Sequence, residues 1–274
     1  MTDSTHHSLR FFDAHNHLHA ENLIGHPSDI VADAERIGIV RMVVNGATEQ
    51  DWPEVLELAR RHKCVMPSFG LHPRYIAEHS TGWQKTLMAH LDAIPSAVGE
   101  IGLDRWIEKF DSPDQEAVFT AQLRIAAERN LPVTIHCLRA WGRLHELLAK
   151  HSLPVRGFLL HSYGGSREMV PRFAELGAYF SISGQFAADW KTRQRETFLH
   201  VPIDRLLIET DAPFMLPPES HITHPLRDPK TTRPVNHPAN LGSIYEFVAG
   251  LLELSLEDLA VIVEKNFLRF FDGL

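Results

Sequence analysis

The stretch Phe11 to His19, which reads F-F-D-A-H-N-H-L-H, sets the plan of the chain. Two phenylalanines begin an expected β-strand, and His15 and His17 follow with one residue between them. In an extended backbone this spacing places both imidazoles on one face, where they could bind one metal ion. Imidazole nitrogen suits Zn, Mn, Fe or Co better than Ca or Mg. Because the chain contains 18 histidines, the pair alone is equally compatible with surface or packed histidines.

Short apolar runs alternate with amphipathic stretches along the rest of the chain. Further strands are expected at residues 39–47, 64–71, 97–104, 132–137, 157–163, 179–183 and 206–213, and helices at 50–62, 115–130, 239–254 and 256–271. Alternating strands and helices indicate a parallel sheet, and about eight units favour closure into a barrel. The length of 274 residues is close to the ~250 typical of that fold. We therefore expect an α/β protein with a single domain, a TIM-like (β/α)8 barrel over residues 1–274, of which 1–9 form a flexible tail.

Two details refine this plan. Residues 216–238 are rich in Pro and Thr and lack periodicity, so we expect a long loop over the barrel mouth after the eighth strand. Ser255, three residues before Asp258, is expected to cap the last helix.

Composition and charge exclude several classes of protein. No apolar run approaches the ~20 residues needed to cross a bilayer, and the first residues do not resemble a signal peptide. Cys64 and Cys137 show no metal-binding or disulfide spacing, so a reduced, cytoplasmic location without membrane contact is expected. The formal charge of −8 argues against a broad basic surface for duplex nucleic acid. It leaves room for a small pocket in which bound cations supply the positive charge for one strand end.

Histidines and carboxylates gather where the expected strands end. In a barrel of parallel strands, the carboxyl ends of the strands form the face that carries the chemistry. Scattered residues would rarely coincide with so many strand ends, so the set predicts a metal centre. Its members, in chain order, are His15, His17, His72, Glu100, Asp104, His136, His161, Glu209 and Asp211.

The chemistry of two divalent ions suggests how these residues divide the work. Two ions ~3.5–4 Å apart need a bridging carboxylate, and Glu100 is the natural candidate. His15, His17 and Asp211 would bind one ion, and His136 and His161 the other. Metal coordination lowers the pKa of water from ~15.7 toward ~7, and Asp211 could then accept its proton. Glu100 and Asp211 are therefore the expected catalytic residues, and the nucleophile would attack phosphorus or a carbonyl carbon.

The chain resembles the TatD-like DNase family of metal-dependent hydrolases. The matching motifs cover nearly the whole chain in the same order, and the ordered set is more specific than any one of them. They are D-A-H-N-H at 13–17, G-L-H-P at 70–73, G-E-I-G-L-D at 99–104, I-H-C at 135–137, L-H-S-Y-G-G-S at 160–166, E-T-D-A-P at 209–213 and N-F-L-R-F-F from 266.

This resemblance implies a TIM-like barrel that hydrolyses phosphodiester bonds, typically as a 3′ to 5′ exonuclease on DNA and possibly RNA. It implies two divalent metal ions, for which mixed His and carboxylate ligands admit Mg, Mn or Zn. His72 matches a histidine that contacts the substrate phosphate in the family. Leu138 stands where many members have an arginine, and Arg139 comes one position later. By the resemblance, the metal ligands are His15, His17, Glu100, His136, His161 and Asp211.

Several residues next to the expected ligands have two interpretations each. Arg139 could bind a phosphate through its planar guanidinium or be solvated at a helix start. Trp106 and Tyr163, each just past a ligand strand, could stack on a base or pack in the core or rim. Asp104 could cap its loop or orient a ligand histidine, and Glu209 could pair with a buried base or bind a metal ion. His19, which has no matching partner, is expected at the surface, and Cys137 is expected to pack.

Three functions of different classes remain open at this point. The first is a nuclease-type phosphodiesterase whose partner is the end of a single-stranded DNA, acting as a probable monomer with His72, Arg139, Tyr163 and Trp106 as its substrate-binding residues. The second is a C–N bond hydrolase, such as an amidase or deacylase, on the same barrel. The third is a metal-binding module without activity, which the complete set of expected ligands disfavours.

Overall fold

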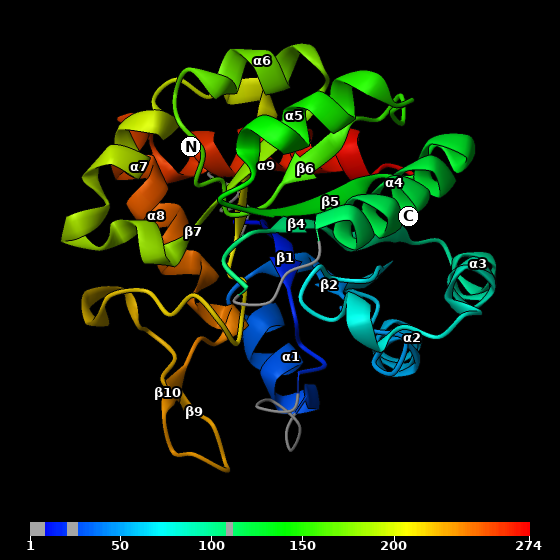
Figure 1. Cartoon of the computed structure of the whole chain (residues 1–274). Coiled ribbons are helices and arrows are strands. Elements are labelled where there is room, and N and C mark those ends of the chain that lie inside the picture. Colours follow the sequence, from blue (N-terminus) through cyan, green and yellow to red (C-terminus); the bar gives the residue numbers. More distant parts are fainter. Residues whose placement is uncertain (1–8, 21–26, 108–111) are drawn as a thin grey trace, which may run out of the picture.

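The computed structural model describes residues 9–20, 27–107 and 112–274. Its strands form one eight-stranded sheet in the order β1 to β8, and every pair of neighbours in that order is parallel. The expected single-domain, TIM-like barrel is confirmed, with the helices outside the strands (Figure 1). The strands are β1 (Phe11–Asn16), β2 (Ile39–Asn45), β3 (Val65–Phe69), β4 (Ala97–Asp104), β5 (Val133–Leu138), β6 (Phe158–Leu160), β7 (Ala178–Ser183) and β8 (Leu206–Glu209).

The helices follow the strands along the chain and cover the outside of the sheet. Helices α4, α5 and α6 lie together on one side, and α2 and α3 lie next to each other on another (Figure 1). The helices are α1 (Pro27–Arg36), α2 (Trp52–Arg61), α3 (Trp83–Ala93), α4 (Ser112–Arg129), α5 (Trp141–Lys150), α6 (Met169–Glu175), α7 (Thr192–Phe198), α8 (Leu241–Leu252) and α9 (Leu256–Phe271). None of the described helices is long and apolar enough to cross a membrane.

The register of β4 against β5 brings the expected ligands of both strands to one end of the barrel. Gly102 lies opposite His136, and Asp104 lies opposite Leu138. Gly102 has a φ of 152°, and a Cβ at this position would lie 1.9 Å from the carbonyl oxygen of His136. Only glycine allows the two backbones to approach so closely, which explains the second glycine of the G-E-I-G-L-D motif.

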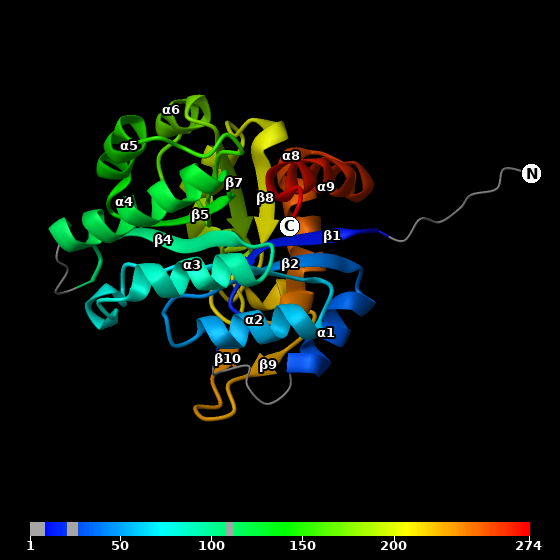
Figure 2. The same cartoon turned by 90° about the vertical axis from the view of Figure 1, so that its right-hand side faces the viewer.

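Strands β1 and β8 meet at a seam that helices α8 and α9 cover (Figure 2). The hydroxyl of Tyr245 on α8 accepts a hydrogen bond from the Phe12 amide and donates one to the Phe12 carbonyl, both at 3.1 Å. The side-chain amide of Asn266 on α9 donates to the carbonyl of Ile203, just before β8, and to that of Leu206, the first residue of β8, at 2.8 and 2.9 Å. Two polar side chains thus satisfy backbone groups that a continuous strand ladder would otherwise use.

Two sequence-based expectations need correction, and one is confirmed. Residues 1–8 of the expected tail lie outside the described residues, but Leu9 is partly buried and packs against the core. The segment 216–238 is not only loop, because β9 (Leu226–Arg227) and β10 (Pro234–Val235) pair as a small antiparallel hairpin within it. Ser255 caps α9 as expected, since its hydroxyl accepts the amide of Asp258 at 3.0 Å.

We predict that Tyr245→Phe destabilises the protein by ~1–3 kcal/mol, because it leaves two buried backbone groups of Phe12 without a partner. The measurement is the free energy of unfolding in urea. Tyr75→Phe is the matched control, since no described residue hydrogen-bonds to the Tyr75 hydroxyl, and we expect it to change stability by less than ~0.5 kcal/mol. Equal stability of Tyr245→Phe and the wild-type protein would contradict this account of the seam.

Candidate metal centre

The carboxylate of Glu100 lies at the centre of a cluster of histidines at the barrel mouth. Glu100 extends from β4 and is only 2% exposed. Its two oxygens face different sets of imidazole nitrogens, which come from β1, the end of β3, β5 and the end of β6. The distances to Oε2 are 3.2 Å from His17 Nε2 and 3.4 Å from His15 Nε2, and those to Oε1 are 2.8 Å from His161 Nε2, 2.9 Å from His136 Nδ1 and 3.3 Å from His72 Nε2.

Asp211 completes the side of the cluster that contains His15 and His17. Its Oδ1 lies 3.6 Å from His15 Nε2 and 3.5 Å from His17 Nε2. This oxygen is buried and makes no hydrogen bond to any described residue. A buried carboxylate oxygen without a hydrogen-bond donor normally carries a large desolvation cost, and a bound cation would remove it.

The donor atoms fit a divalent metal. Three groups bring their donor atoms within 4.8 Å of one another, and two of the three share Glu100. Imidazole nitrogens together with carboxylate oxygens are the ligand set of Zn and of related divalent metals. The groups are His15, His17 and Glu100; His72, Glu100 and His136; and His15, His161 and Asp211.

Contacts behind three of the histidines hold one ring nitrogen and leave the other directed at the centre. His17 Nδ1 lies 2.7 Å from the carbonyl of Asn45 and donates to it, so Nε2 is the nitrogen that could bind a metal ion. His161 presents Nδ1 to Glu209 at 3.5 Å, which favours a proton there and leaves Nε2 directed at Glu100. His136 is reversed, since its Nε2 faces the Asp104 carboxylate at 3.5 Å and its Nδ1 faces Glu100.

His72 directs a proton at the centre and therefore has a different role. Its Nδ1 accepts a hydrogen bond from the Arg74 amide at 3.1 Å. Burial lowers the pKa of His72 to about 4, so near neutral pH the ring holds one proton, on Nε2. This N–H points at Glu100. Although the distances place His72 in a ligand group, its hydrogen bonds make it a donor, which agrees with a contact to a substrate oxygen.

Asp13 supports the cluster from below and was not among the site residues expected from sequence. Its Oδ1 accepts the Thr210 amide at 2.9 Å, and its Oδ2 accepts the Thr210 hydroxyl at 2.6 Å. Beyond it, the Asp211 amide donates to the His15 carbonyl at 2.9 Å, and the His17 amide donates to the Ala212 carbonyl at 2.7 Å. Asp13 thus fixes the ligands of β1 against the ligand after β8. Its place within the D-A-H-N-H motif was the only signal for this role.

Burial and charge set the protonation of the two catalytic candidates. Burial acts to raise the pKa of Glu100, but the surrounding histidines, His161 foremost, outweigh it and hold the pKa well below its usual range. Glu100 is therefore ionised at neutral pH. Burial raises the pKa of Asp211 to about 7, so its carboxyl group gains and loses a proton near neutral pH. A group with this pKa suits a general base.

The two interpretations of Asp104 and of Glu209 are resolved by their contacts. Asp104 does both things considered for it, since its Oδ1 accepts the Trp106 amide at 2.8 Å and its Oδ2 faces His136. Glu209 is fully buried beneath His161 and accepts the hydroxyl of Ser181 at 2.5 Å. Both carboxylates therefore orient candidate ligand histidines from behind. Ser181 is a supporting residue for which the sequence contains no local signal.

Tyr163 and His19 differ from what the sequence predicted, and Trp106 had two possible interpretations. Tyr163 is 0% exposed, packs against Trp141 at 4.8 Å between ring centroids and donates its hydroxyl to the Ser166 carbonyl at 2.9 Å. The expectation that Tyr163 stacks on a base is corrected by this burial, which leaves the ring no free face. His19, expected at the surface, is 7% exposed and faces Asp51 at 3.5 Å. Trp106, by contrast, is 60% exposed.

Comparison with known proteins agrees with this geometry. A family model described as TatD related DNase matches residues 12–272. The chain is 30% identical over 263 residues to "Uncharacterized metal-dependent hydrolase YabD" of Bacillus subtilis (strain 168), covering 95% of this chain and 98% of the relative. It is 32% identical over 267 residues to "3'-5' ssDNA/RNA exonuclease TatD" of Salmonella typhimurium (strain LT2), again covering 95% of this chain and 98% of the relative.

Solved structures show the same architecture. The crystal structure of YjjV, a TatD homologue from Escherichia coli K12, superposes with a TM-score of 0.86 at 26% identity and covers 97% of this chain and 99% of that one. A TatD-family hydrolase from Entamoeba histolytica superposes with a TM-score of 0.84 at 19% identity, over 97% of this chain and 99% of that one, and shows the fold alone. With its barrel, its cluster of metal-binding side chains and these matches, the chain belongs to the TatD-related DNase family of metal-dependent hydrolases.

Proposed function

We propose that this protein is a two-metal phosphodiesterase that removes nucleotides from the 3′ end of single-stranded DNA or RNA. The observation that carries the proposal is the division of donors around one carboxylate. Glu100 Oε2 faces His15 and His17, and its Oε1 faces His136 and His161. A bridging carboxylate with two histidines on each side is the arrangement that a pair of divalent ions needs. Relatives of about one-third identity are named 3′-5′ ssDNA/RNA exonucleases.

When bound, the metal ions would supply positive charge that stabilises the phosphate and makes a water molecule acidic enough to act as a nucleophile. The other steps belong to the chain. Asp211 Oδ1 has no hydrogen-bond donor among the described residues, so it can accept the proton of the attacking water. His72 directs its Nε2 proton into the centre and can donate it in a hydrogen bond to a phosphate oxygen. Asp104 and Glu209 keep His136 and His161 in the required orientation.

The same barrel could hydrolyse a C–N bond, because an activated water attacks carbonyl carbon as readily as phosphorus. The bridging position distinguishes the two classes only by analogy, since a lysine there would favour the amide hydrolases and this chain has Glu100. The names of the relatives favour phosphodiesters. We therefore retain amide hydrolysis as an outcome of the test.

The decisive assay incubates purified protein with single-stranded DNA labelled at its 5′ end, and in parallel with simple amides, in the presence of Mg²⁺, Mn²⁺ or Zn²⁺. We expect the DNA to shorten stepwise from the 3′ end and a chelator to stop the reaction. Hydrolysis of the amides without any shortening of DNA would contradict the proposal and support the alternative.

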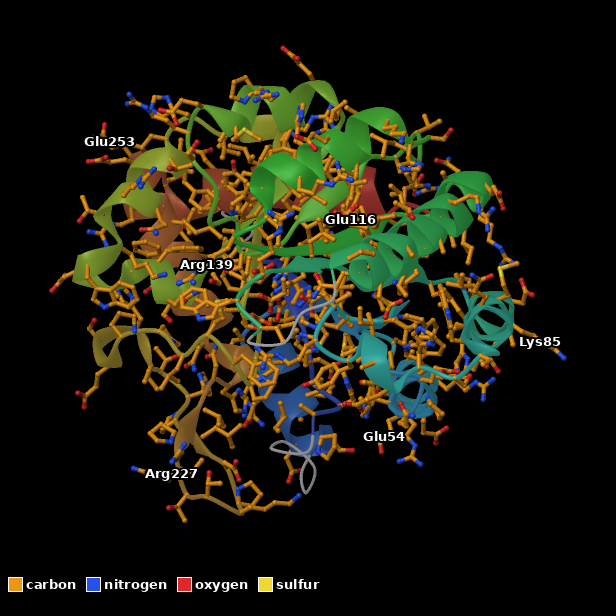
Figure 3. All side chains as sticks on the ribbon, viewed as in Figure 1. Glu54, Lys85, Glu116, Arg139, Arg227 and Glu253 are labelled. Atoms are coloured by element: carbon orange, nitrogen blue, oxygen red, sulfur yellow. The ribbon has the colours of Figure 1, made fainter. Side chains whose placement is uncertain are left out.

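We predict that Glu100→Gln lowers hydrolysis at least ~100-fold, the scale on which loss of one transition-state contact acts, because the uncharged amide cannot bridge two cations. The substitution preserves side-chain volume, so circular dichroism should remain unchanged. Glu54→Gln is the matched control, because Glu54 is exposed on the outer helix α2 (Figure 3). An active Glu100→Gln enzyme that still binds two metal ions per chain would refute the bridging role.

We also predict that the affinity for Mn²⁺ increases with pH. Protons compete with the metal for Asp211, whose pKa is about 7, so below pH 7 the carboxyl group must lose a proton before it can bind. One such competition changes the apparent Kd ~10-fold between pH 6 and pH 8, and protonated histidine ligands add to the change. Isothermal titration calorimetry measures it, with Asp211→Asn as the comparison that should show a smaller pH dependence. Equal affinities of the wild-type protein at the two pH values would speak against the assigned ligands.

A further inference from the structure

Two exposed side chains at the rim of the barrel mouth form a stacked pair. The guanidinium carbon of Arg139 lies 3.9 Å from the centroid of the Trp106 ring. Trp106 is 60% exposed and Arg139 is exposed as well, although both follow strands that carry buried ligands. Trp106 and Arg139 are far apart in the sequence, and the structure joins them in one surface.

Hydrogen bonds at the ends of β4 and β5 connect this pair to the candidate metal centre. Asp104 Oδ1 accepts the Trp106 amide at 2.8 Å, while its Oδ2 lies 3.5 Å from His136 Nε2. The Arg105 amide donates to the Leu138 carbonyl at 3.0 Å, which ties the end of β4 to the end of β5. One carboxylate thus connects the backbone of the stacking tryptophan to a candidate ligand. This contact fixes the backbone of Trp106 relative to the centre.

The groups in this pair and their few other contacts suit a binding role. Arg139 forms no hydrogen bond or ion pair with any described residue, so its contact within the described chain is the indole face. At an exposed site this contact contributes only ~0.5–1 kcal/mol. It nevertheless presents a flat, cationic and aromatic surface to solvent at the entrance to the site. Tryptophan rings and arginine planes are the groups on which proteins stack unpaired nucleobases.

We propose that Trp106 and Arg139 together form a stacking subsite for a base of single-stranded nucleic acid, at a nucleotide next to the scissile phosphate. This inference rests on the proposed nuclease function. An unpaired strand offers the faces of all its bases, whereas in a duplex every base except those of the terminal pairs is covered on both faces. The subsite would therefore select single strands over duplexes without any basic surface, in keeping with the net charge of −8.

The experiment combines substitutions in the protein with removal of bases from the substrate. Oligodeoxynucleotides that lack one base, at the 3′-terminal, the second or the third nucleotide, are compared with the intact strand by their kcat/KM. Stacking contributes ~1–3 kcal/mol per base, so for the wild-type enzyme one of these abasic positions should lower kcat/KM ~5- to 150-fold. For Trp106→Ala, removal of the base at the same position should lower kcat/KM less than ~3-fold. This vanishing of the penalty is the coupling that a double-mutant cycle measures.

Conservative variants separate stacking from charge and from folding. Trp106→Phe should retain most of the penalty because it keeps a ring, whereas Arg139→Lys should lose part of it because the planar group is gone. Trp190→Ala is the matched control. Trp190 is 76% exposed and lies 4.6 Å from the Lys191 ammonium on η3 (Asp189–Lys191), so its removal should leave the penalty at that position unchanged.

A strand without any bases distinguishes the possible failures. We expect the wild-type enzyme and Trp106→Ala to cleave this strand at equal rates, because nothing remains to stack. If Trp106→Ala cleaves it more slowly than the wild type, or keeps the wild-type penalty at every abasic position, the stacking subsite is refuted and the nuclease function stands. If the wild-type enzyme cleaves none of the strands, the proposed function itself fails.

Discussion

One buried carboxylate, surrounded by five imidazoles within 3.4 Å, is the interaction on which the rest of this structure depends. An isolated carboxylate in such a place would be too costly to ionise, yet Glu100 stays charged because the histidines around it outweigh the effect of burial. The histidines come from segments that are far apart in the sequence. Only a barrel of parallel strands, in which every strand end reaches the same face, brings them to one point.

The contacts that join β1 to β8 and close the barrel also hold the site together. Asp13 binds Thr210, and the amides of Asp211 and His17 bind across to the opposite segment. The residues that close the barrel are therefore the candidate ligands themselves or their immediate neighbours. Tyr245 and Asn266 complete the seam from the helix layer. The fold is consequently most constrained where the chemistry is placed.

Sequence reasoning predicted the parts of this arrangement that repeat with the period of the backbone. The strand at 97–104 and the last helix at 256–271 match the structure at both ends, because each is a continuous apolar or amphipathic pattern with clear boundaries. The convergence of the expected ligands followed from the position of each at a strand end. The short hairpin within 216–238 was missed, since strands of two residues leave no periodic signal.

The other features that were not predicted concern the neighbours of a residue in space and not the position of the residue on its strand. Tyr163 is covered by Trp141 and Phe173, which α5 and α6 supply from other parts of the chain. The role of His72 depends on one amide hydrogen bond from Arg74, and that of Ser181 on a contact with Glu209. The contacts of Tyr163 and Ser181 are tertiary and carry no local signal, whereas that of His72 is local but depends on the orientation of its ring. The pairing of Trp106 with Arg139 is also tertiary, because it joins the ends of two neighbouring strands.

Anomalous diffraction tests most directly whether Glu100 bridges two divalent ions. A crystal of the protein soaked in Mn²⁺ should show two anomalous peaks, one between Glu100 Oε2 and the pair His15 and His17, and one between Glu100 Oε1 and the pair His136 and His161. A crystal with Mn²⁺ bound elsewhere and no peak on either side of Glu100 would contradict the account.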